Sequence, residues 1–93
     1  MGDTEKGIKM ISAATEVLNY KKKHIGSSNE EIMNHVANKI SNERDNPTRF
    51  AMIGAASRAL SLSERNPGMS DREIIKDIVA EISSIIHTVE SHS

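Results

Sequence analysis

The residues best suited to acid–base catalysis or metal binding are histidines, but their spacing does not group them. They are His24, His35, His87 and His92, and no two of them are a single helical turn apart. Asp77 also takes the place of His35 in the repeat described below, which excludes a metal site common to both halves. Surface exposure accounts for these histidines. We therefore predict no catalytic residue, no metal and no cofactor.

Paired carboxylates are the usual agents of general acid–base catalysis, and they occur at Glu30-Glu31 and again at Asp71 and Glu73. Each pair directly follows a serine in the pattern Ser-x-x-Glu, which is the capping box that opens many helices. Negative charge in a first helical turn also interacts favourably with the helix dipole. The pairs are therefore interpreted as helix caps. Since the chain also has no cysteine for thiol chemistry, we predict that it is not an enzyme.

Cationic side chains form a run that could contact the phosphates of a nucleic acid. The candidate basic patch comprises Lys21, Lys22 and Lys23, with Arg44 and Arg49 added if the fold brings them to the same end. The formal net charge is only −1, from 12 basic and 13 acidic residues, so no global field attracts nucleic acid. Lysines also suit the negative end of a helix dipole. A nucleic-acid-associated accessory protein is therefore the alternative hypothesis.

These candidates lie on an internal repeat with an offset of 42 residues. Residues 28–41 (SNEEIMNHVANKIS) match residues 70–83 (SDREIIKDIVAEIS), and the register extends back without a gap to residues 8 and 50. The 34 aligned pairs contain 11 identities, where about two are expected from average composition. Because caps and apolar residues recur but reactive groups do not, the pattern indicates a tandem duplication with a structural purpose.

Apolar periodicity predicts four helices, near residues 4–24, 28–43, 47–65 and 70–89. The expected core faces of the first and third helices are Ile8, Ile11, Ala14, Leu18 and Phe50, Ile53, Ala56, Leu60. Two repeats are too few for a solenoid, which generally needs three or more. We predict an all-α fold, a four-helix bundle made of two tandem-duplicated helical hairpins with pseudo-two-fold symmetry. Residues 1–93 would form one domain, with repeat one at about 3–44, repeat two at about 45–89 and a frayed tail at 90–93.

The composition of the chain bears on where the protein is located and on whether it associates with itself. The absence of cysteine favours a cytoplasmic protein without a disulfide framework. The N-terminus lacks the apolar segment of a signal peptide, and no stretch is apolar enough to predict a membrane span. Apolar residues make up only 37% of the chain, and Tyr20 and Phe50 are the sole aromatic residues. So small a core raises the expectation of self-association.

The two halves differ in the last predicted helix, whose apolar stripe continues through Ile85, Ile86 and Val89. The aligned residues of the first half are Glu43, Arg44 and Pro47, so the repeated core does not need these aliphatic side chains. We predict that they form the interface of a homodimer, the commonest oligomer. The leading hypothesis is a small non-catalytic helical module that binds proteins, itself included. A third hypothesis, a ligand-binding helical bundle, would require an enclosed pocket near His35.

Overall fold

The computed structural model describes residues 2–92, with side chains for residues 4–87, and every regular element in that range is a helix. Helix α1 spans Gly2–Lys23, α2 spans Asn29–Lys39, α3 spans Asn46–Arg65 and α4 spans Asp71–His92. The prediction of four helices without strands is confirmed for the described part of the chain. Helix α2 ends before the predicted residue 43, because no apolar side chain beyond Ile40 continues its buried stripe.

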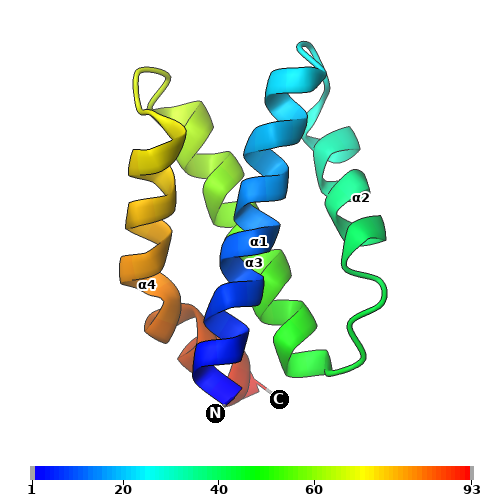
Figure 1. The fold of residues 1–93 in the computed structure, drawn as a ribbon, viewed down its shortest axis with the longest axis vertical. Coiled ribbons are helices and arrows are strands. Elements are labelled where there is room, and N and C mark those ends of the chain that lie inside the picture. The colour runs from blue at the N-terminus through cyan, green and yellow to red at the C-terminus, as the bar shows by residue number, and fades with distance from the viewer. Residues whose placement is uncertain (1, 93) are drawn as a thin grey trace.

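Helices α1 and α3 run in the same direction and pack against each other through the middle of the bundle (Figure 1). Helix α4 flanks this pair on one side and α2 flanks it on the other. The α1–α2 and α3–α4 loops lie together at one end, here called the loop end. The two termini and the α2–α3 link lie at the opposite end, here called the terminal end.

Capping side chains set where three of the helices begin. The Ser28 hydroxyl accepts the amide of Glu31 at 3.1 Å, and the Glu31 carboxylate accepts the amide of Ser28 at 3.2 Å. Ser70 and Glu73 make the same two bonds at 3.2 and 3.0 Å. Both predicted capping boxes are thus present. At α3 the Asp45 carboxylate accepts the Thr48 amide at 3.1 Å. These bonds satisfy amides that have no partner inside a first helical turn.

The core is aliphatic, with small residues where the two central helices meet. Ala14 and Ala56 are fully buried, as is Ala55, while Ala13 is only 2% exposed. Larger side chains of α1, α2 and α4 are fully or almost fully buried in the same core: Met10, Val17, Ile32, Val36, Ile74 and Ile78. Alanine lets two helix backbones approach closely, and the aliphatic residues then fill the space on either side.

The sequence-based assignment of the first core positions was wrong for Ile8 and Phe50, which are 63% and 52% exposed. The buried face of α1 instead begins at Met10 and continues through Ala13 and Val17. This stripe is rotated relative to the predicted one, and both fit a period of 3.6 residues because α1 is apolar on more than one side. Within the described residues, no helix is long and apolar enough to cross a membrane.

Candidate functional site

A group of titratable side chains lies between α1 and α2, near the loop end. His35 of α2 places Nε2 2.7 Å from Glu16 Oε1 of α1. The Tyr20 ring stacks on His35 with centroids 4.3 Å apart, and it stacks on His24 at 4.2 Å. Glu16 and Tyr20 lie one turn apart on α1. His24 directly follows the last residue of α1, and its amide donates to the Tyr20 carbonyl at 2.9 Å. Sequence reasoning did not pair His35 with Glu16, because the two lie on different helices.

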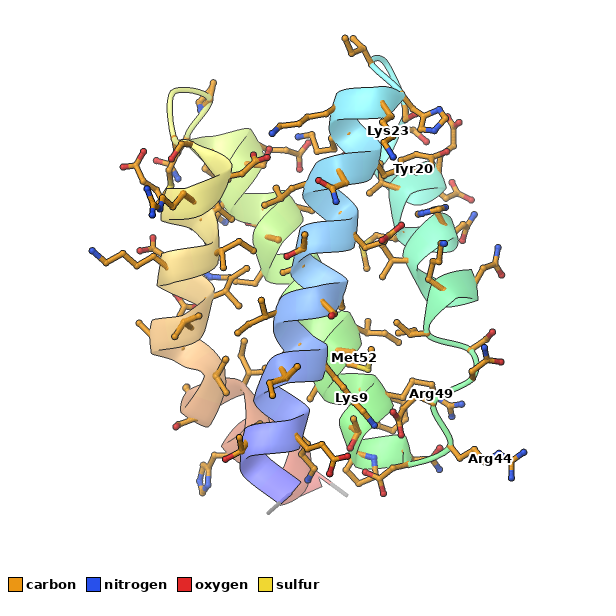
Figure 2. All side chains as sticks on the ribbon, in the orientation of Figure 1. Lys9, Tyr20, Lys23, Arg44, Arg49 and Met52 are labelled. Atoms are coloured by element: carbon orange, nitrogen blue, oxygen red, sulfur yellow. The ribbon has the colours of Figure 1, made fainter. Side chains whose placement is uncertain are left out.

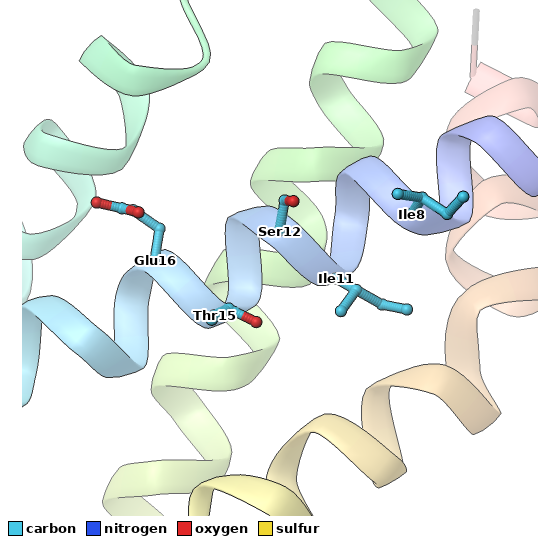
Figure 3. Close-up of a pocket in the computed structure, with 5 residues that line it drawn as sticks. All are labelled: Ile8, Ile11, Ser12, Thr15 and Glu16. Atoms are coloured by element: carbon cyan, nitrogen blue, oxygen red, sulfur yellow. The ribbon is translucent and has the colours of Figure 1, made fainter.

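This group joins α2 to α1. A carboxylate beside an imidazole is a familiar catalytic pair, but it acts on a substrate held in a cleft. The most evident hollow, about 390 Å³, is lined by Ile8, Ile11, Ser12, Thr15 and Glu16 of α1 alone (Figure 3). His35 does not line it, so the ligand-binding hypothesis gains no support. The described residues also contain no cluster of three or more groups able to hold a metal ion.

The five residues of the candidate basic patch are not brought together. Lys23 lies at the loop end, whereas Arg44 and Arg49 lie at the terminal end (Figure 2). Helix α2 runs from the loop end toward the terminal end, so the residues just before it and just after it lie at opposite ends of the bundle. Arg49 donates to the Asn46 side chain at 2.7 Å. The five side chains therefore do not form one continuous positive surface.

Two lysines at the loop end have polar partners on other helices. Lys22 Nζ lies 2.6 Å from Asp71 Oδ2 of α4, and Lys21 Nζ donates to Ser63 Oγ of α3 at 2.7 Å. The same end carries the acidic first turns of α2 and α4. These contacts tie α1 to the second hairpin. Their arrangement favours a structural role for the lysine run over a nucleic-acid site.

A second polar group joins α1 to the α2–α3 link at the terminal end. Lys9 Nζ donates to Glu43 Oε1 at 2.6 Å, and the Glu43 carboxylate also accepts the Asp45 amide at 3.1 Å. The Lys9 bond lowers the pKa of the Glu43 carboxyl group, and the Glu43 bond raises the pKa of the Lys9 ammonium group. Hydrogen bonds from Thr48 lower the pKa of Asp45. All three groups are therefore stabilised in their charged forms, as expected for an ion pair and a helix cap.

The predicted dimer interface lies at the end of α4, and its described members face the bundle. Ile86 is 6% exposed and belongs to the core. Ile85 is half-buried, and its Cγ2 would lie 3.3 Å from a Cβ placed on Gly54. The side chain of Val89 lies outside the described residues. The interface stays a prediction, but Ile86 has little surface left to offer a second chain.

Among the described residues, four large apolar side chains are exposed, those of Ile8, Ile25, Phe50 and Val79, and two of the four occupy matching positions of the two repeats. Ile8 on α1 and Phe50 on α3 are separated by the repeat offset, and both are more than half exposed. Each lies one turn before a half-buried isoleucine, Ile11 or Ile53. We call the Ile8–Ile11 pair and the Phe50–Ile53 pair the two apolar faces. Figure 3 shows Ile8 and Ile11 on α1, among the residues that line the hollow.

Comparison with known proteins adds no information about the function of this chain. No protein-family model matches the chain, and neither a curated protein nor a solved structure is similar to it.

Proposed function

We propose that this protein is a non-catalytic helical module that works by protein association, first with a second copy of itself, through its apolar faces. The supporting observation is that Phe50, one of two aromatic residues in the chain, is 52% exposed in a protein with a small core. A chain this short gains stability by burying such a ring, so leaving it in water is costly unless a partner covers it. Aromatic side chains are also common anchors of protein interfaces.

We also propose that the bundle arose by tandem duplication and has approximate two-fold symmetry. Matching polar contacts support this proposal. Lys22 contacts Asp71, and the residues 42 positions away from each, Glu64 and Asn29, contact each other at 3.0 Å. Lys21 contacts its own equivalent, Ser63, and residues that contact their own equivalents must lie beside a two-fold axis.

Core positions support the duplication as well. Ile32 and Ile74 are each 1% exposed, and Val36 and Ile78 are each fully buried. Each hairpin also has a polar contact made from the same position of its central helix, although the partner positions differ, since Glu81 aligns with Lys39 and not with His35. Glu16 pairs with His35 in the first hairpin, while Arg58 pairs with Glu81 at 2.9 Å in the second. Arg58 is the repeat equivalent of Glu16. Opposite charges at equivalent positions would let each central helix distinguish its own hairpin partner.

Light scattering on the parent and on two charge variants tests the proposed association. Ile8→Glu and Phe50→Glu each place a carboxylate in an apolar face, and we expect each to weaken self-association at least tenfold without lowering the melting temperature. Burying an unpaired charge at an interface is strongly unfavourable, whereas an exposed position on a free bundle tolerates it.

Asn34→Glu is the matched control, since Asn34 is exposed on α2 and the variant adds the same charge. It should associate as the parent does. A parent that remains monomeric at every concentration would exclude self-association. An equally strong effect of Asn34→Glu would instead mean that net charge, rather than the apolar faces, governs association.

A further inference from the structure

We infer that the interface between the two hairpins is itself a binding surface for a second copy of this chain, so that two chains can exchange hairpins to form a closed dimer. The α1–α2 hairpin would then pack against the α3–α4 hairpin of the other chain. This inference concerns the buried contacts between hairpins and does not depend on the exposed apolar faces.

Contacts between the hairpins make up the centre of the molecule. Helices α1 and α3 belong to different hairpins, and their alanines Ala14 and Ala56 are fully buried at the bundle centre. Lys22–Asp71 and Asn29–Glu64 add polar contacts between the hairpins at the loop end. Neither hairpin can bury its apolar stripe alone. A hairpin from another chain provides the same surface, so exchange preserves these contacts.

The link between the hairpins has few bonds to lose. It comprises residues 40–45, and six residues can extend to about 20 Å. The side-chain bonds of the link stay within one hairpin, as Lys9–Glu43 and Asp45–Thr48 do, except for the bond from the Asp45 amide to Glu43. That bond is exposed to solvent, so water replaces it when the link opens. Opening the link therefore costs few hydrogen bonds.

Charges at the loop end select which hairpins pair. In the observed pairing Lys22 meets Asp71, while Glu64 meets the neutral Asn29. Two copies of the second hairpin would instead place Glu64 against Asp71, which is repulsive. Two copies of the first would lose the ion pair, because Lys22 would meet Asn29. Pairing of a first hairpin with a second hairpin is thus preferred, and a dimer is the smallest exchanged assembly in which every hairpin has such a partner.

Concentration decides between the closed monomer and the exchanged dimer, because both contain the same contacts. A short link holds the hairpins at an effective concentration on the order of millimolar. We expect refolding at millimolar chain concentration to yield a dimer by light scattering, and refolding at micromolar concentration to yield a monomer. Deleting Ser41 and Asn42 should raise the dimer fraction several-fold, since a short hinge disfavours closure. Inserting four residues after Asn42 should lower it, and the same insertion after Gly26, inside a hairpin, should have no effect.

A mixture of two defective chains gives the decisive result. Ala14→Glu disables the first hairpin and Ala56→Glu disables the second, because each places a charge at a fully buried position. Each variant alone should be largely unfolded by circular dichroism. Refolded together at high concentration, they should regain helicity as a dimer, in which the two intact hairpins form one native bundle.

A mixture that shows no more helicity than the separate variants would overturn the inference. The inference would also be overturned if neither the deletion nor the insertion in the link changed the fraction of dimer. Ile8→Glu and Phe50→Glu leave hairpin exchange intact, so they separate this dimer from association through the apolar faces. A dimer lost in those variants but unaffected by the link would support the proposed function and reject exchange.

Discussion

The two hairpins share a sequence pattern but finish their second helices differently. Helix α2 has 11 residues and α4 has 22. At equivalent positions, Glu43 binds Lys9 across the first hairpin, whereas Ile85 packs against Gly54 in the second. At the terminal end, the first hairpin is thus held together by an ion pair and the second by aliphatic packing. The comparison teaches that the repeated residues specify the middle of the bundle. At the terminal end, either an ion pair or aliphatic packing can hold the last part of the hairpin in place.

The largest expected effect tests whether the hairpins depend on each other. Ile32→Ala and Ile74→Ala should each lower the free energy of unfolding by about 2–5 kcal/mol, because each leaves a cavity in the core. Both isoleucines are 1% exposed. Chemical denaturation followed by circular dichroism should show a single transition for each variant. Two separate transitions, with only one shifted, would show that each hairpin is stable alone.

A smaller effect is expected at the crossing of the central helices. Enlarging Ala14 or Ala56 to Leu should overpack the core and cost about 1–3 kcal/mol. Both alanines are fully buried, so the two variants should be destabilised alike. Thermal melts measure this directly. If either variant is as stable as the parent, the bundle is more open at that position than its structure indicates.

The capping boxes offer an equivalent pair of surface positions. Ser28→Ala and Ser70→Ala should each cost about 0.5–2 kcal/mol, because a first-turn amide loses the hydroxyl that accepts its hydrogen bond. We expect Ser70→Ala to have the larger effect on cooperative unfolding, since α4 is the longer helix. Hydrogen exchange of the Glu31 and Glu73 amides would locate the loss. Equal protection in variants and parent would argue against the caps as the source of stability.

The smallest effects separate two glycines that lie inside helices. Gly7→Ala should stabilise the protein by about 0.5–1 kcal/mol, because alanine restricts the unfolded chain more than glycine does. Its Cβ would lie 3.6 Å from Ile82, an ordinary contact. At Gly54 the Cβ would lie 3.3 Å from Ile85, so the gain should be cancelled.

Truncating Ile85 provides the control for this pair. In an Ile85→Ala background, Gly54→Ala should become stabilising, which a double-mutant cycle by thermal denaturation would detect. Additive effects of the two substitutions would show that Ile85 is not the reason for glycine at position 54.

The sequence by itself determined the helices and most of the core. Short-range rules are enough for this purpose, because a cap such as Ser28–Glu31 or a stop such as Pro67-Gly68 acts within a few residues. The repeat added long-range information, since it identified Ala14 with Ala56 and both proved fully buried. Periodicity could not fix which of two apolar stripes on α1 turns inward, because Ile8 and Met10 both belong to plausible faces.

Only the tertiary structure decided the contacts between helices. His35 meets Glu16 and Lys22 meets Asp71 through the relative rotation and height of packed helices, which no local pattern encodes. The same packing buries Ile86, which the comparison of the two repeats had placed outside the core, and it exposes Phe50, which hydrophobicity alone would bury. It also sends Lys23 and Arg44 to opposite ends of the bundle. Side-chain burial depends on how complete helices fit together, and that fit is a property of the assembled core.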